Sequence, residues 1–213
     1  MINEIIEKFE PEVTELAWVE RYGGLAKPVR IVQPNVADRT VAVAHYISTP
    51  SDSDQTKLLA EKRYKFLIPD KSIKSIMYFE QPQSETLVDG VGKTNYCRYQ
   101  TDIKLIAWLN LKKIGVEQTT IKGRCMQQLV SIFNQKNWGS TASAHNIKTS
   151  NVTIDNDAAT LALFAKYSYG NSQYLHFYPY EVLSITIPVR YTVYLNCLDE
   201  INITNIDCVK YEN

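Results

Sequence analysis

The stretch that decides the fold is CRYQTDIKLIAWLNL, residues 97–111. Apolar residues occupy alternate positions, from Cys97 through Ile103 to the end, while Arg98 and Lys104 stand between them. Side chains alternate between the two faces of a strand, so this pattern predicts a long strand with one buried and one solvent-exposed face. LSITIPVRYTVYLNC, residues 183–197, alternates in the same way and predicts a second long strand.

Two amphipathic helices are predicted as well. In the N-terminal helix, the residues at helical spacing are Ile2, Ile5, Ile6, Phe9, Val13 and Leu16. Pro11 lacks a backbone donor and is expected to break or restart this helix, and Gly23 with Gly24 is expected to end it. The second helix is expected over residues 119–134. Its apolar stripe is Ile121, Cys125, Leu129, Ile132 and Phe133.

Shorter strands are predicted at 29–32, 40–47, 62–68, 73–80 and 151–154. The order of helix, strands, helix and strands indicates an α+β fold, with a mostly antiparallel sheet, an N-terminal helix and one helix packed on the sheet. Alternating βαβ units are not indicated.

The length of 213 residues suits a single domain covering residues 1–213. Polar residues with turn formers predict mobile loops at 48–55 (STPSDSDQ) and 84–93. The residues between the second helix and the last long strand, 135–180, are interpreted as an insertion within the domain.

The charges balance, with 23 Lys and Arg against 23 Asp and Glu. No global field therefore attracts nucleic acid or an anionic membrane, although a local basic patch is left open. No run approaches the roughly 18 apolar residues of a membrane-spanning helix, and the N-terminus lacks the pattern of a signal peptide. We expect no membrane partner and a cytoplasm-like compartment.

Reactive constellations are missing from the sequence. His45, His145 and His176 stand on different segments, which predicts no metal site. Gly92-Lys93-Thr94 matches only the tail of a phosphate loop, because Leu87 stands where the first glycine belongs. No nucleophile lies near a base and an orienting group. We therefore expect a non-enzymatic protein without a cofactor and without catalytic residues. An enzyme whose site is assembled from distant positions is the least favoured alternative.

The four cysteines show no zinc-like spacing and are expected to be mostly buried free thiols: Cys97, Cys125, Cys197 and Cys208.

One apolar feature stands on the polar face of the first long strand, where Ile106 and Trp108 replace the charges seen earlier. Either another element of the chain covers them, or they contact a partner. The aromatic stretch 174–180 (YLHFYPY) has the same two interpretations, since Tyr and Trp are enriched at interfaces. The candidate partner interface consists of Ile106, Trp108, Tyr174, Phe177, Tyr178 and Tyr180.

The layout resembles virion proteins of the head–tail junction in tailed phages. The resemblance rests on YQTDIKLIAWLNL (99–111), QQLVSIF (127–133) and ITIPVRYTVYLNC (185–197). The segment SIKSIMYFEQ (72–81), followed by DIKLIAWLNL, resembles structural proteins of Bacteroidetes phages, including the crAss-like group. Tail-terminator and neck proteins of this kind pack a helix on an antiparallel sheet and assemble into rings.

The resemblance implies a virion structural protein that forms a homo-oligomeric ring as a neck protein, connector or tail terminator, assembled in the host cytoplasm. Its expected partners are copies of itself and neighbouring portal, connector or tail proteins, without sequence-specific nucleic acid. The family carries no catalytic residues over to this chain. The alternative is a carbohydrate- or small-ligand-binding module that uses Trp108, Trp138 and the 174–180 aromatics as stacking surfaces.

Overall fold

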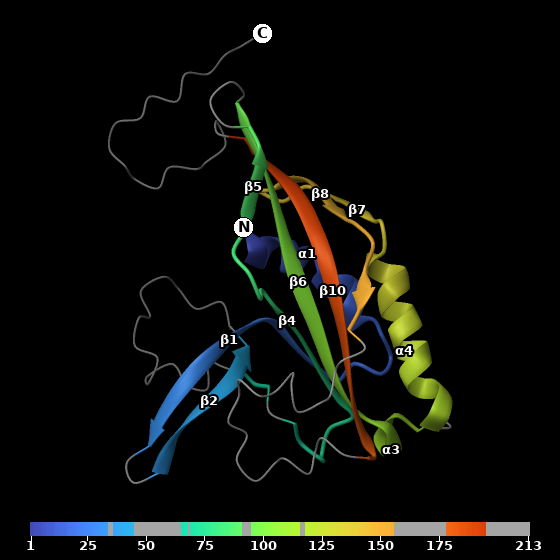
Figure 1. The fold of residues 1–213 in the computed structure, drawn as a ribbon. Helices are drawn as coiled ribbons and strands as arrows, with labels where there is room; N and C mark the ends of the chain where they lie inside the picture. The colour runs from blue at the N-terminus through green and yellow to red at the C-terminus, as the bar shows by residue number, and fades with distance from the viewer. Residues whose placement is uncertain are drawn as a thin grey trace.

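The computed structural model describes residues 1–33, 36–44, 65–67, 69–90, 95–115, 118–155 and 178–194. These residues form an α+β fold in which helices cover a mostly antiparallel sheet, as expected (Figure 1). The helices are α1 (Ile2–Thr14), α3 (Leu111–Ile114) and α4 (Gln118–Phe133). The strands are β1 (Arg21–Gln33), β2 (Val36–Ala44), β3 (Lys65–Phe66), β4 (Ser75–Glu80), β5 (Thr86–Asp89), β6 (Tyr96–Asn110), β7 (Asn137–Gly139), β8 (His145–Thr149), β9 (Thr153–Ile154) and β10 (Tyr180–Tyr194).

The sheet is built on the two long strands that the alternation predicts. β6 and β10, each 15 residues long, are antiparallel and paired from Tyr180 opposite Asn110 to Tyr194 opposite Tyr96. The principal strand order is β3-β2-β1-β4-β6-β10-β8-β7, with β5 paired to β6 and β9 paired to β10. Among the described strands, only β1 and β4 pair in parallel.

The main core lies between the two amphipathic helices and one face of the sheet. Phe9 of α1 and Phe133 of α4 meet in an edge contact with ring centroids 5.2 Å apart. Phe79 of β4 and Trp138 of β7 complete this aromatic group, at 6.0 and 4.4 Å from Phe9. The alternate residues of β6 and β10, such as Ile103 opposite Ile187, line the same cluster. The predicted stripes of both helices are therefore the faces that they bury.

Two expectations about the N-terminal region are wrong. Pro11 lies inside α1, which continues to Thr14 because Phe9 and Val13 on either side of the proline are both buried in the main core. Gly23 and Gly24 do not end the helix but lie within β1. A Cβ on Gly23 would come within 2.6 Å of the Leu67 side chain, so the missing side chain makes room for Leu67.

The 84–93 segment also differs from the expected mobile loop, because residues 86–89 form β5 and pair with Gln100, Tyr99 and Arg98 of β6. Gly90 follows with φ +112°, and a Cβ there would lie 2.1 Å from the Tyr96 carbonyl oxygen. The close return of the chain onto β6 therefore requires a glycine at this position. The predicted loop 48–55 lies outside the described residues.

The 135–180 segment contributes β7, β8 and β9, which extend the sheet beside β10. Its described part therefore belongs to the same layer as the long strands. The remainder, 156–177, lies outside the described residues.

We predict that Phe9→Ala destabilises the protein by about 3–5 kcal/mol, because it removes the ring that joins both helices to the sheet. Urea unfolding followed by circular dichroism measures the loss. The control is Glu7→Ala, an exposed change on the same helix, which should stay within about 0.5 kcal/mol of the wild type. Equal losses for the two variants would contradict this account of the core.

Candidate functional site

The structure decides between the two interpretations that the sequence left open for Ile106 and Trp108. Their exposed fractions are 0% and 1%, and both belong to a second apolar cluster on the sheet face opposite the helices. Tyr180 is partly buried and stacks on Trp108, with ring centroids 5.1 Å apart. Of the two alternatives that the sequence left open, cover from within the chain therefore applies to these residues.

The cover comes from segments that are distant in sequence. Ala26 of β1, Leu67 and Ile73 belong to the second cluster together with Ile106 and Trp108. Long-range packing of this kind leaves no periodic signal in the sequence, which explains why the sequence left both interpretations open and did not identify the covering segments. Of the remaining candidates, Tyr178 is 65% exposed. Tyr174 and Phe177 lie outside the described residues.

The same burial removes two stacking surfaces from the ligand-binding alternative. Trp108 is buried as described, and Trp138 is 7% exposed. The Nζ atom of Lys136 lies 4.3 Å from the centroid of the Trp138 ring. Neither indole therefore presents an open face on which a sugar ring could stack.

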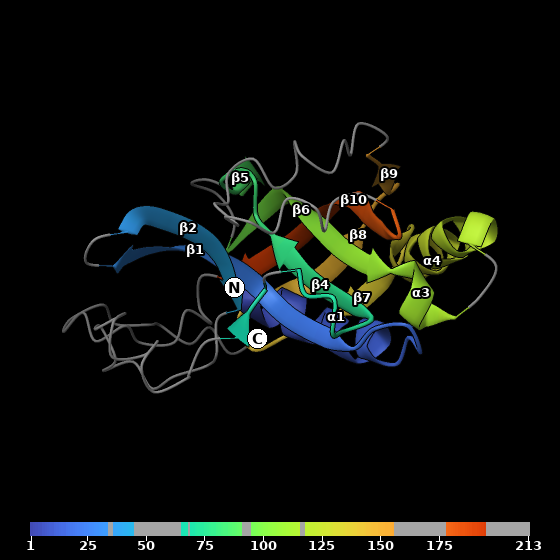
Figure 2. The ribbon, with the colours of Figure 1, turned by 90° about the horizontal axis from the view of Figure 1, so that it is seen from below.

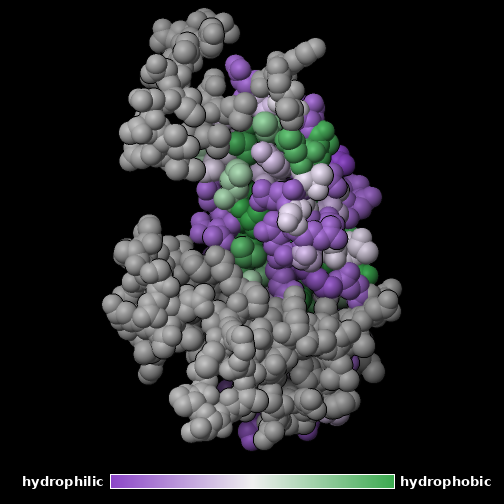
Figure 3. Space-filling model, turned by 60° about the vertical axis from the view of Figure 1, so that its left-hand side comes forward, coloured by the Kyte–Doolittle hydropathy of each residue, from purple (hydrophilic) through white to green (hydrophobic). Residues whose placement is uncertain are grey.

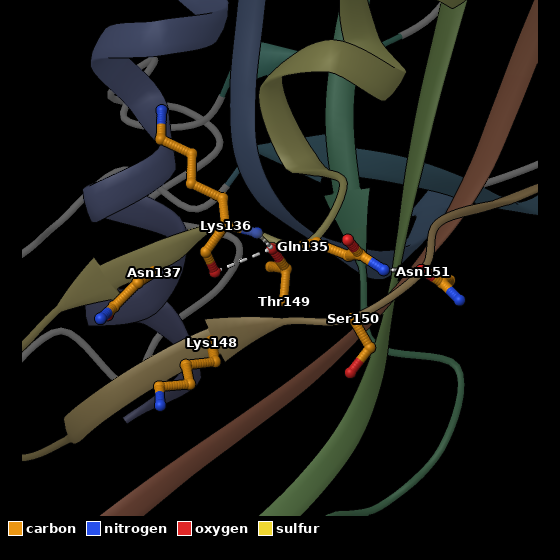
Figure 4. Close-up of a pocket in the computed structure, with 7 residues that line it drawn as sticks. All are labelled: Gln135, Lys136, Asn137, Lys148, Thr149, Ser150 and Asn151. Atoms are coloured by element: carbon orange, nitrogen blue, oxygen red, sulfur yellow. Dashed lines mark hydrogen bonds between the residues drawn. The ribbon is translucent and has the colours of Figure 1, made fainter.

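A polar pocket of about 470 Å³ lies beside β7 and β8 (Figure 4). Gln135 Nε2 donates to Asn151 Oδ1 over 2.7 Å, and the Lys136 backbone amide donates to Thr149 Oγ1 over 3.1 Å. Lys136 extends toward α1, where its Nζ pairs with Glu12 at 2.8 Å, while Lys148 points the opposite way. Amides, hydroxyls and two lysines line this pocket, so it offers hydrogen bonds but no carboxylate to act as a base.

A charged cluster is centred on Asp155, which follows β9. Its carboxylate accepts hydrogen bonds from Ser184 Oγ at 2.6 Å and Thr186 Oγ1 at 3.1 Å, and it pairs with Lys104 Nζ at 3.0 Å. Partial burial tends to raise the pKa of Asp155, but the bonds from Ser184, Lys104 and Thr186 outweigh it and hold this pKa below its usual range. Every oxygen is paired, so the cluster anchors β9 to the sheet and carries no free base.

The remaining reactive residues give no metal site in the described part of the chain. His145 packs its ring against Tyr194 at 5.0 Å, and no group of three or more His, Cys, Asp or Glu residues there could hold a metal ion. Cys97 and Cys125 are buried free thiols, as expected, and burial raises the pKa of Cys125 to about 11. His45, His176, Cys197, Cys208 and Gly92-Lys93-Thr94 lie outside the described residues.

Two strand surfaces stand out as potential contacts. From Ala26 onward, β1 pairs with β2 rather than β4, and Figure 2 shows this hairpin projecting from the rest of the described structure. All four residues of β5 are exposed, including Leu87 at 41% and Val88 at 56%. Figure 3 brings the left-hand side of Figure 1 forward. It shows hydrophobic surface among hydrophilic side chains in its upper part. Neither surface is predicted from the sequence.

No helix of the described residues is long and apolar enough to cross a membrane. No protein-family model, curated protein or solved structure matches this chain.

We predict that Asp155→Asn lowers the free energy of unfolding by about 1–3 kcal/mol at pH 7, since it removes the charge that Lys104 and two hydroxyls stabilise. The folded-state pKa of Asp155 lies below its unfolded value of about 3.9, so this stabilisation is present above that pH and is lost as the pH falls through the folded pKa.

Urea unfolding of wild type and variant between pH 3 and pH 7 tests this prediction, since the difference should shrink toward the acidic end. The matched control is Asp89→Asn, which removes an exposed pair with Arg98 at 3.5 Å and should cost no more than about 1 kcal/mol. A loss no larger than that of the control at pH 7 would show that the cluster is not stabilising.

Proposed function

We propose that this chain is a non-enzymatic structural subunit that assembles with copies of itself into a ring at the head–tail junction of a tailed phage. The projecting hairpin of β1 and β2 supports the proposed assembly. The phage setting rests on the resemblance of the long strands and the second helix to neck and tail-terminator proteins. Neighbouring portal, connector or tail proteins are the proposed further partners.

The observation that carries the proposal is the extent of the hairpin beyond the sheet. β1 pairs with β4 only as far as Leu25, whereas its pairing with β2 runs from Ala26 opposite Ala44 to Gln33 opposite Val36. In the described chain, β2 has no strand partner other than β1 and β3. A two-stranded ribbon is marginally stable by itself in water, so a hairpin of this length gains stability from packing on another surface.

The residue types of the hairpin fit such a contact. Alternate register positions pair Lys27 with Val43, Val29 with Val41 and Ile31 with Arg39. By sequence, these six residues are four branched apolar residues and two cations, a mixture compatible with an interface that has an apolar core and a polar rim.

Contact between a hairpin on one subunit and a different surface on the next is heterologous. Such contacts close into a ring when the rotation between subunits closes. The exposed apolar residues of β5 offer a second surface on each subunit, because an uncovered edge strand is a template for further pairing. The balance of 23 basic and 23 acidic residues limits repulsion between identical neighbours.

The experiment removes the outer part of the hairpin and rejoins its two strands at a pair of residues that lie opposite each other. Residues 29–41 are replaced by Asn-Gly, so that Pro28 and Ala42, which are paired in the structure, flank a two-residue turn. We expect the wild type to form discrete oligomers in mass photometry and rings in negative stain. We expect the shortened chain to remain folded by circular dichroism but to stay monomeric.

A full-length control carries Pro34→Asn and Asn35→Gly, which places the same dipeptide between Gln33 and Val36 without shortening the strands. This control should assemble like the wild type. Assembly of the shortened chain at wild-type concentrations would show that the hairpin is not the contact. A wild type that stays monomeric over a concentration series would contradict self-assembly itself.

A further inference from the structure

A second pocket, of about 490 Å³, opens at the end of the sheet where β5, β6, β8 and β10 meet. The residues of interest in its wall are Asp89, Arg98, Asn146, Lys148, Arg190 and Thr192. Arg98, Lys148 and Arg190 are all exposed. They occupy the alternate positions of their strands that face away from the main core.

This pocket is cationic in a chain whose total charge is zero. Arg98, Lys148 and Arg190 stand in its wall against the single carboxylate Asp89. Asp89 pairs with Arg98 over 3.5 Å. Within the described residues, neither Arg190 nor Lys148 has a carboxylate within ion-pair distance. Two positive charges in the pocket are therefore left without a counterion.

The sheet register sets these two charges beside each other. Arg190 of β10 is the direct partner of Lys148 on β8. Like charges at directly opposed positions of an antiparallel pair destabilise the sheet. A bound anion would turn this repulsion into two favourable contacts, which is a physical reason for such a pair at the mouth of a pocket.

The Arg190 side chain is also held in place. Its Nε donates to Gln100 Oε1 over 2.9 Å, and Gln100 is the register partner of Arg190 on the other side, on β6. This bond uses one donor of the guanidinium and leaves the two terminal amino groups for a ligand. A guanidinium held in this way matches two oxygens of a phosphate, while a lysine supplies a mobile point charge.

Neutral donors complete the arrangement. Thr192 lies two residues along β10 from Arg190, so both are on the same sheet face, and it is the register partner of Arg98. Thr192 and Asn146 are both among the residues that line the pocket. Phosphate oxygens also accept hydrogen bonds from such neutral groups, in addition to those from Arg and Lys.

We infer that this pocket binds a phosphate group, with Arg190 and Lys148 as the principal contacts and Thr192 and Asn146 as additional donors. The volume of the pocket exceeds that of a single phosphate, which leaves room for a larger ligand that carries the group, either a small phosphorylated molecule or a phosphodiester segment. Contacts of this kind carry no base-sequence information, because they reach only the phosphates. The inference stands apart from the proposed ring and does not depend on it.

The test uses two probes that share the phosphate group, namely inorganic pyrophosphate and a fluorescein-labelled oligothymidylate of twelve nucleotides. Calorimetry follows the first and fluorescence anisotropy the second, both in full-length protein at low ionic strength. The double variant R190Q/K148Q should weaken binding about tenfold or more, since each phosphate contact with Arg or Lys is charge-assisted. For the oligonucleotide, its salt dependence should also become shallower.

The control is K112Q/K122Q, which also removes two positive charges, but from exposed sites outside the pocket. When both assays are repeated at about 0.15 M salt, where the Debye length is about 8 Å, this control should bind as the wild type does, within about twofold. Competition by pyrophosphate against the oligonucleotide shows that both reach one site. Binding of the oligonucleotide alone assigns a phosphodiester, and binding of pyrophosphate alone assigns a small phosphorylated ligand. Failure of both probes, or equal losses in the two double variants, would overturn the inference.

Discussion

The continuous pairing of β6 with β10 is the constraint on which the rest of the structure depends. Both strands are 15 residues long and remain in register from end to end. A shift by one residue would move every core side chain to the opposite face, so the buried face fixes the register. Once it is fixed, β4 and β5 attach to one side of β6, and β8 and β9 attach to the free side of β10.

Along the paired strands β6 and β10, the sheet face opposite the helices has two end regions with different chemistry. At the Asn110 end, Ile106 and Trp108 are buried under segments from the first third of the chain. At the Tyr96 end, the same face exposes Arg98 beside Arg190 and forms the cationic pocket. The Asp155 cluster with Lys104 lies between them along β6. Along a single face, β6 therefore contributes Arg98 to the wall of the candidate anion site, Lys104 to a structural ion pair, and Ile106 and Trp108 to apolar packing.

The candidate surfaces were harder to predict from sequence than the core was. Arg98 and Arg190 read as ordinary exposed residues of two strands 92 positions apart, and nothing local places Lys148 beside them. Only the pairing of β10 with both β6 and β8 brings these charges together. The sequence predicts the hairpin as two short strands, 29–32 and 40–47, because apolar alternation does not show where the sheet ends. Conversely, the sequence left open whether Trp108 is covered or contacts a partner, and only the packing of distant segments decides that it is covered.

The sequence by itself determined the α+β class, the two long strands and the buried stripes of both main helices, because period-2 and period-3.6 patterns are local and reflect one buried face. It did not determine that Pro11 stays within α1, that β5 forms next to Gly90, or that residues after 135 join the sheet. These outcomes depend on contacts outside the local segment, from the return of β5 onto neighbouring β6 to the packing of α1 on the distant strands. The free energy of those contacts outweighs the local conformational preference of each segment. Tertiary structure alone decided which polar residues share a surface, because strand pairing sets those neighbours.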